Sequence, residues 1–375
     1  MALRDGFVSL LVGLTACAGV SPRPELANAA DLPMSQATSE DRARLPAVLE
    51  QAMEAAVSRR FEDARAAANE ALAIDPRSAR ARAVLAMVHL QRAAETSPHD
   101  LHSANAGEVE MRLAQQLAPD DAFVGWMAAV FLYDSGHTSA AAAAAEQALA
   151  RAGDRPTAER AALLFIAGIY RYELGEERAA LPHLQAYVAL RPDDATSHFR
   201  LGSCLLRIAA VPKGIQNSLL DAQRTAESAA RAFARCAELS PGDEDAALAV
   251  AIALWRATQL AIEGADAGRD QNLNAATAQL RAVADRFPTS AMPWFQLGVI
   301  AEATAAPVQA RTAYEAALQR DPRHVPTMLN FAALLATSDQ RDASITLWKQ
   351  VLAADAAQPS LTPRERQRLR ELIGS

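Results

Sequence analysis

Residues 294–322 read WFQLGVIAEATAAPVQARTAYEAALQRDP, and their spacing decides the fold. The small and apolar positions are Trp294, Leu297, Gly298, Ala310, Tyr314 and Ala317, followed by Pro322. Steps of three and four residues place side chains on one face of a helix. The segment therefore predicts two helices, with Gly298 in the first and Pro322 just after the second.

The second half of this motif recurs along the chain. The corresponding residues are Ala64, Ala68, Ala71 and Pro76; Gly107, Met111, Ala114 and Pro119; Ala141, Ala145, Ala148 and Gly153; Ala180, Leu184, Tyr187 and Pro192; Ala229, Phe233, Cys236 and Pro241; Ala276, Leu280, Val283 and Pro288; and Ala343, Leu347, Val351 and Ala356. The first half recurs as pairs such as Ala167-Gly168 and Leu201-Gly202. We therefore predict an all-α chain of about eight helix-turn-helix units.

This pattern resembles the tetratricopeptide repeat (TPR), a unit of about 34 residues made of two antiparallel helices. The resemblance implies a right-handed TPR superhelix, or α-solenoid, over 45–357, with a C-terminal capping helix at 358–375. The expected units lie near 45–78, 79–121, 122–155, 161–194, 195–243, 244–290, 291–324 and 325–357.

Three units are longer than a plain repeat. The extra residues lie near 94–105, 208–224 and 258–274, and their prolines and glycines favour loops with slightly lengthened helices. They are either tolerated surface insertions or a rim that contacts a partner.

The capping helix has its own start signal. Thr362 can cap a helix, Pro363 suits its first position, and Glu365 can complete a capping box. The arginines that follow would solvate the end of the array, with a basic docking site as the alternative.

The N-terminus resembles a bacterial lipoprotein leader. Residues 7–16 form an apolar run that is too short to span a bilayer but suits a signal-peptide core. The sequence Leu14-Thr15-Ala16-Cys17 resembles a lipobox, in which the cysteine is acylated. We therefore predict a signal peptide at 1–16 and lipidation of Cys17.

The segment after this cysteine contains several prolines and no periodicity, which predicts a lipidated disordered tether at 17–44. The resemblance implies an outer-membrane lipoprotein in the bacterial cell envelope, facing the periplasm. An ordinary leader cut after Ala29 and an uncleaved N-terminus are the alternatives.

In the TPR family, the first helix of each unit lines a concave face that binds partners. The residues in that register, which we call the partner wall, are Phe123, Trp126, Val130, Tyr133, Phe165, Ile169, Tyr172, Phe199, Leu206, Leu248, Ile252, Trp255, Phe295 and Val299. An apolar wall would accept a protein or peptide ligand through buried area. The alternative is that these aromatic residues belong to the core.

Other classes of function find little support in the sequence. The net charge is −7 and no basic stripe is present, so no nucleic-acid partner is expected. The motifs of zinc proteases, serine hydrolases and phosphate-binding loops are missing, so we predict no enzyme, no catalytic or metal site and no cofactor. His99 and His102 lack a further metal ligand. Cys204 and Cys236 either pair in an oxidising periplasm or remain buried thiols.

Together these features predict a lipid-anchored periplasmic TPR scaffold or adaptor that binds a protein partner. The resemblance suggests a role in assembling an envelope machine for pili, secretion or polysaccharide export. The alternative is a glycan- or peptidoglycan-binding accessory to a cell-wall enzyme, which requires polar and aromatic groups exposed together.

Overall fold

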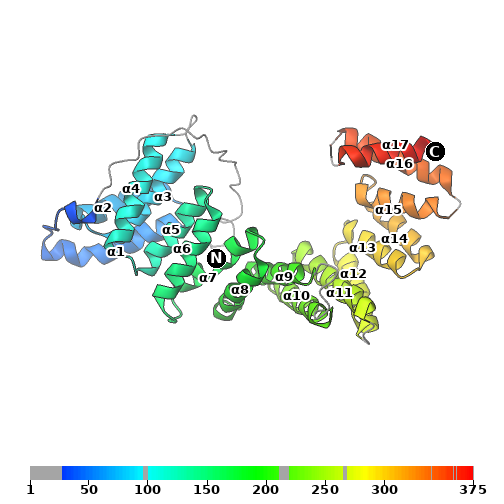
Figure 1. The fold of residues 1–375 in the computed structure, drawn as a ribbon, viewed down its shortest axis with the longest axis horizontal. Helices are drawn as coiled ribbons and strands as arrows, with labels where there is room; N and C mark the ends of the chain where they lie inside the picture. The colour runs from blue at the N-terminus through cyan, green and yellow to red at the C-terminus, as the bar shows by residue number, and fades with distance from the viewer. Residues whose placement is uncertain are drawn as a thin grey trace. The chain divides into compact units, whose positions relative to one another are not determined.

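The regular elements of the protein are helices arranged in pairs (Figure 1). The computed structural model describes residues 28–95, 100–210, 219–264, 268–338, 340–357, 359 and 361–374, and no strand occurs among them. Two compact units divide the chain, Met1–Arg200 and Leu201–Ser375.

The first unit contains four helix pairs. Its helices are α1 (Ser39–Val57), α2 (Phe61–Ile74), α3 (Ala79–Glu95), α4 (Leu101–Leu117), α5 (Ala122–Asp134), α6 (Thr138–Ala152), α7 (Ala158–Glu173) and α8 (Glu177–Leu190). Each helix packs against the next, and α1, α3, α5 and α7 also pack against one another in succession. Because the first helix of each pair contacts the first helix of the following pair, the pairs are stacked in chain order.

Alanine lets these helices approach closely. Ala64, Ala68 and Ala71 on α2 have no exposed surface, and Ala141 and Ala145 repeat the arrangement on α6. A methyl side chain keeps the helix backbones close and has the best helix propensity of any residue. The alanines spaced three and four residues apart therefore form the contact face of α2 and α6.

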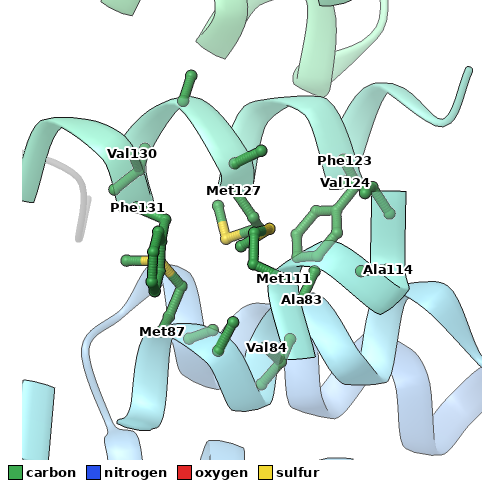
Figure 2. Packing of buried hydrophobic residues seen from close by; sticks show 14 of the residues in the cluster. Ala83, Val84, Met87, Met111, Ala114, Phe123, Val124, Met127, Val130 and Phe131 are labelled. Carbon is green, nitrogen blue, oxygen red and sulfur yellow. The ribbon is translucent and has the colours of Figure 1, made fainter. Parts of the chain in front are cut away.

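Larger side chains fill the space between successive pairs. Figure 2 shows Phe123, Met127 and Phe131 of α5 facing Met111 of α4 and Met87 of α3. All five side chains are buried in one hydrophobic cluster that continues from α1 to α7. The flexible methionines suit the irregular gaps between helices of different pairs.

The predicted tether is wrong for residues 28–44, because this stretch is ordered and joined to the first unit. Ala29 is buried in a short 3-10 helix (Ala29–Asp31), and its amide donates to Oε1 of Gln116 at 2.8 Å. The Arg77 guanidinium donates to the carbonyls of Ala29 and Leu32 at 3.0 and 3.3 Å. The hydroxyl of Ser35 donates to the carbonyl of Ile74 at 2.6 Å.

We call residues 28–38 the N-terminal strap. It leads directly into α1, where Thr38 and Asp41 form a capping box. Tertiary hydrogen bonds order the strap even though its sequence has no periodic apolar pattern. Residues 17–27 of the predicted tether lie outside the described residues.

The second unit is also built from helix pairs. Its helices are α9 (Ala195–Ile208), which begins just before the unit boundary, α10 (Leu219–Leu239), α11 (Glu244–Gly264), α12 (Arg269–Arg286), α13 (Met292–Ala303), α14 (Pro307–Arg320), α15 (Val325–Ala336), α16 (Arg341–Ala357) and α17 (Pro363–Gly374). From α10 to α14 each helix packs against the next, as do α14 with α15 and α15 with α16, and α13 also contacts α11 and α15.

The predicted insertions lie where helices are longer than in a plain repeat. α3 and α4 have 17 residues each, α10 and α11 have 21, and α12 has 18. Parts of the insertions, namely 96–99, 211–218 and 265–267, lie outside the described residues. The described parts extend helices.

Gly298 shows why a small residue is needed where the helices of a pair meet. A Cβ at this position would lie 2.3 Å from the ring of Tyr314, which has no exposed surface. The same close approach occurs at Gly202, where a Cβ would lie 2.8 Å from the ring of Phe233. In both pairs glycine makes room for an aromatic ring on the second helix.

The register predicted for the eighth pair is wrong by one residue at two positions. Ala343 is exposed and Leu347 is only partly buried, whereas Ser344 and Trp348 are buried with Val351. The Ser344 hydroxyl donates to the carbonyl of Ala332 at 2.7 Å, which satisfies a polar group at a position that alanine occupies in most other pairs.

The C-terminal capping helix α17 covers the last pair. The hydroxyl and amide of Thr362 both donate to Glu365 at 2.7 Å, and the Glu365 amide donates back to the Thr362 hydroxyl at 3.3 Å. Leu369 is buried against Met328 and Trp348. Leu369 thus covers part of the apolar surface that an open repeat array would otherwise expose.

One described helix, α11, has a segment long and apolar enough to cross a membrane, Glu244–Ile262. Of the most apolar 18-residue stretch of this helix, 61% is buried inside the fold. This is the pattern of a core helix.

The predicted fold class is confirmed for the described residues. They form eight helix pairs followed by a capping helix, in the order that the repeats indicated.

Candidate protein-binding wall

The partner wall divides between the two units and between buried and partly exposed side chains. In the first unit it lies on α5, α7 and the start of α9, and in the second unit on the rest of α9, α11 and α13. All fourteen residues share one helical register, and burial separates them into two groups.

Four residues of the partner wall belong to the core, and their assignment to a partner surface is corrected. Phe123, Val130, Leu248 and Trp255 are between 1% and 9% exposed. Phe123 and Val130 pack in the cluster between α5 and its neighbours (Figure 2), and Leu248 and Trp255 pack between α11 and its neighbours. A helix that packs against neighbours on several sides keeps little of its surface exposed. The helical register alone therefore overestimates how many of these side chains a partner can reach.

The other residues keep part of their surface open. In the first unit these are Trp126, Tyr133, Phe165, Ile169, Tyr172 and Phe199. In the second unit they are Leu206, Ile252, Phe295 and Val299, and Ile252 is 36% exposed. The first unit therefore presents the larger group of partly exposed aromatic side chains.

A pair of stacked tyrosines lies where the ends of α5 and α7 meet. The rings of Tyr133 and Tyr170 are 4.3 Å apart between centroids and only 9° from parallel. The Tyr133 hydroxyl donates to Oε2 of Glu173 at 2.8 Å. Burial and this carboxylate raise the pKa of the Tyr133 hydroxyl above its usual range.

A second carboxylate, Asp134, follows Tyr133 at the end of α5. Burial raises the pKa of the Asp134 carboxyl, although the Arg59 guanidinium lies 3.9 Å from its Oδ2 and opposes the shift. Burial and the charge of Asp134 also raise the pKa of Tyr170, which is 4% exposed. Asp134 is thus a partly buried carboxylate at the end of α5.

Two indole groups have buried N–H donors without a hydrogen-bond acceptor among the described residues. They are Nε1 of Trp126 on α5 and Nε1 of Trp294 on α13. The Arg320 guanidinium lies 4.6 Å from the Trp294 ring centroid and contacts its face. A buried donor without an acceptor is unfavourable.

In the second unit aromatic groups also contact one another. Phe295 lies 5.3 Å from His324 and 6.4 Å from Tyr314 between ring centroids. The Tyr314 hydroxyl donates to Oε2 of Glu302 at 2.8 Å. This tyrosine–carboxylate pair joins the two helices of a single repeat, whereas Tyr133 and Glu173 join two successive repeats.

The sequence reasoning missed Asp134, Tyr170 and Glu173. A signal for two of them was present, because α5 and α7 end in Tyr133-Asp134 and Tyr172-Glu173 at equivalent positions of successive repeats. Nothing in the sequence showed that Tyr170, one turn before the end of α7, would stack on Tyr133.

The chemistry of other sites is limited in the described part of the chain. No group of three or more His, Cys, Asp or Glu residues suited to a metal ion occurs there. His99 of the weak metal candidate lies outside the described residues, as does the predicted lipidation residue Cys17. Cys204 and Cys236 are both buried in the fifth pair.

Comparison with known proteins shows similarity at the level of structure only. No family model and no curated protein sequence matches the chain. PilF of Pseudomonas aeruginosa is 16% identical, with 65% of this chain and 94% of that chain covered and a TM-score of 0.43. TTC0263, a thermophilic TPR protein of Thermus thermophilus, is 17% identical, with 57% and 99% covered and a TM-score of 0.35.

The human IFIT1 dimer, solved with m7Gppp-AAAA, is 18% identical, with 81% of this chain and 71% of that chain covered and a TM-score of 0.36. At these identities and TM-scores none of the three structures bears on what this chain binds, and the expectation of no nucleic-acid partner remains a prediction. The stacked helix pairs themselves give the chain a TPR-like, all-α repeat fold.

Proposed function

We propose that the chain is a scaffold that binds a protein or peptide partner along the open part of the partner wall in the first unit. The observation that carries this proposal is the row of partly exposed Trp126, Tyr133, Phe165 and Tyr172 on successive first helices. Large aromatic side chains supply much of the binding energy in protein interfaces when a partner desolvates them.

A shared surface on a rigid stack suits an extended or helical ligand. Trp126 and Tyr133 come from α5, and Phe165 and Tyr172 come from α7, which packs directly on α5. The buried halves of these side chains fix their orientation before a partner arrives, so little conformational entropy is lost on binding.

We further propose that the scaffold is anchored in the bacterial envelope through Cys17, as an outer-membrane lipoprotein facing the periplasm. The apolar leader and the sequence Leu14-Thr15-Ala16-Cys17 support this proposal. Acyl chains on one cysteine would supply the membrane affinity, and the folded residues would remain outside the bilayer. The client would then be a component of an assembly machine for pili, secretion or polysaccharide export.

The ordered strap refines this picture of the anchor. Because Ala29 is hydrogen-bonded to Gln116, only residues 17–28 separate the proposed anchor from the described fold. That stretch can span at most about 40 Å when fully extended. The scaffold would therefore work close to the membrane surface.

A glycan-binding accessory to a cell-wall enzyme is the second candidate. Tyr133 and Glu173 place a partly exposed aromatic ring beside an exposed carboxylate, a combination that suits sugar hydroxyls. Against it, one face of the Tyr133 ring is covered by Tyr170, so that face cannot stack on a sugar. The polypeptide partner fits the geometry better.

Photocrosslinking in cells tests the binding proposal. Tyr172 is replaced by p-benzoylphenylalanine, and the matched control carries the same residue at Gln147, which is exposed on the second helix α6. We expect one discrete protein adduct from position 172 and none from position 147. Equal labelling at both positions, or an adduct with glycan alone, contradicts the proposal.

Cell fractionation tests the anchor separately. Cys17→Ser should move the protein from the membrane fraction to the soluble fraction, and the parent chain should incorporate labelled fatty acid. An unchanged distribution would remove the lipoprotein proposal and leave the scaffold proposal intact.

A further inference from the structure

The N-terminal strap contains a residue that the fold buries on all sides. Ala29 is 7% exposed and belongs to the short 3-10 helix of the strap. Its amide donates to Oε1 of Gln116 at 2.8 Å, and its carbonyl accepts from the Arg77 guanidinium at 3.0 Å. Both backbone polar groups of Ala29 are therefore satisfied by residues far along the chain.

Asn28 stabilises the same turn locally. Its side chain accepts a hydrogen bond from the Ala30 amide at 2.9 Å, and its carbonyl accepts one from the Asp31 amide at 3.0 Å. An asparagine that caps its own turn in this way favours a compact conformation over an extended one. Residues 28–31 thus form a folded turn that is fastened to the first unit.

This turn coincides with one of the two candidate cleavage sites of the leader. The sequence Ala-Asn-Ala at 27–29 has the small residues at alternate positions that precede the cut of an ordinary signal peptide. Hydrolysis after Ala29 would consume one water, leave a carboxylate on Ala29 and begin the mature chain with an α-ammonium on Ala30. The turn would then be lost, together with the bonds of Gln116 and Arg77 to Ala29.

The conformation of the turn also disfavours cleavage there in the folded protein. Proteolysis concentrates in exposed segments whose backbone is not hydrogen-bonded. Ala29 is buried, and both its amide and its carbonyl are bonded. The peptide bond after Ala29 is therefore protected by the fold that the strap helps to complete.

We propose that the leader is removed upstream of Asn28 and that the strap is the first folded element of the mature protein. The inference does not depend on acylation of Cys17, because any cut before Asn28 leaves the turn intact. It goes beyond the scaffold proposal by giving the strap a role. The strap joins the N-terminal segment to the ends of α2 and α4, through Ile74 and Gln116.

Mass spectrometry of the full chain, exported by a bacterial host and purified from its envelope, tests the inference. The intact mass and the N-terminal peptide should place the first residue of the mature protein at or before Asn28. A mature protein that begins at Ala30, or one that keeps Met1, would overturn the inference.

The same measurement distinguishes the inference from the proposed anchor. A first residue at Cys17 with the mass of acyl chains supports both. A first residue between 18 and 28 supports the retained strap and contradicts the lipid anchor. None of these results bears on the partner wall, so the scaffold proposal is tested separately.

Ala29→Arg separates the structural role of this position from recognition by a peptidase. We expect the same mature N-terminus as in the parent protein, while the strap amides exchange about 10-fold faster, because the buried site cannot hold a long charged side chain. If Ala29 instead preceded the cut, arginine would block cleavage and unprocessed precursor would accumulate. Unchanged exchange of the strap would also count against the inference.

Met34→Arg is the matched control. Met34 lies in the same strap but is 73% exposed, so arginine there replaces no buried contact. The control should change neither the mature N-terminus nor the exchange of the strap. If Met34→Arg loosened the strap as much as Ala29→Arg, the burial of Ala29 would not be what fastens it, and the proposed role of the strap would fail.

Discussion

The cores of the two units differ although both are built from helix pairs. In the first unit most of the buried side chains form one cluster that runs from Val48 on α1 to Tyr170 on α7, although Ala180 and Leu184 of α8 lie outside it. Among the described residues of the second unit they fall into smaller clusters around α10–α11, α11–α13, α13–α15 and α15–α17, the last two of which share the partly buried Leu318 and Leu347. The same repeat can therefore produce either a continuous or a segmented core.

The difference has consequences for stability. In a stacked array each repeat contacts only its neighbours, so cooperativity depends on how strongly adjacent repeats are coupled. A continuous core couples them, and a segmented core lets one repeat open while the next stays folded. We expect the first unit to unfold as one body and the second unit to open in steps.

The largest effects are expected from filling the close contacts between helices. Gly125→Ala places a Cβ 2.5 Å from that of Ala148, and Gly298→Ala places one 2.3 Å from the Tyr314 ring. Each change should lower the free energy of unfolding by about 1–3 kcal/mol, because the buried neighbour must move.

The difference between the two cores predicts which helices each glycine variant destabilises. Gly125→Ala should lower the protection of α1–α7 together, whereas Gly298→Ala should act mainly on the α13–α15 region. Circular dichroism melting gives the size of each effect, and hydrogen exchange gives its location. Gly242→Ala is the control, because a Cβ there meets nothing within 4 Å. A local effect of Gly125→Ala would refute the continuous core.

A smaller effect is expected from Arg171, which joins three helices of the first unit. Its guanidinium donates to Glu146 on α6 at 2.8 Å and to Glu176 at the start of α8 at 2.6 Å. Arg171→Met should cost about 1 kcal/mol, since charged hydrogen bonds are lost but the methylene packing is kept. Urea unfolding measures this loss of stability. An unchanged midpoint would show that the contacts of Arg171 with Glu146 and Glu176 contribute nothing to stability.

The ionisation of His324 gives a pH test in the second unit. Burial lowers the pKa of its imidazole below 6.5, and its Nδ1 accepts a hydrogen bond from the Thr327 amide that caps α15. Because the folded pKa is lowered, the stability is complete above pH 6.5 and is lost as the pH falls through the folded value.

His324→Asn should keep the cap and remove this pH dependence. We expect the parent protein to lose up to about 1 kcal/mol around α15 below pH 6.5 and the variant to lose less. Hydrogen exchange of α15 at two pH values checks the prediction, and an equal loss in both proteins would contradict it.

The smallest global effect is expected at the N-terminal strap. Arg77→Met removes the bonds to the carbonyls of Ala29 and Leu32. The strap should then exchange faster and become sensitive to limited proteolysis, while the melting temperature changes by only a few degrees. A strap that stays protected would show that the buried Ala29 and the bond to Gln116 hold it alone.

Much of the fold could be predicted from the sequence, because its signals are local. Short-range patterns determine the faces and ends of the helices. They are the closely spaced alanines, the pair of Gly298 and Tyr314, and the cap at Thr362. The strap could not be predicted, since its partners Gln116 and Arg77 lie far along the chain. The first two positions of the motif in the eighth pair were predicted one residue too early, because serine replaces the usual alanine there.

The candidate site could be predicted only in part. Periodicity identifies the face on which Phe123 and Tyr172 lie, but exposure depends on how neighbouring helices pack. Phe123 is covered by α3 and α4, whereas Tyr172 keeps part of its surface open. The stacking of Tyr170 on Tyr133 is a contact between repeats, and no spacing within one repeat indicates it.

Native-state hydrogen exchange of the unmodified protein at increasing low denaturant tests the central claim most directly. Our account predicts that the slowest amides of α1, α3, α5 and α7 share one opening free energy, while those of α11, α13 and α15 open at distinct, lower values. A single common value for the second unit as well, or graded values within the first, would contradict it.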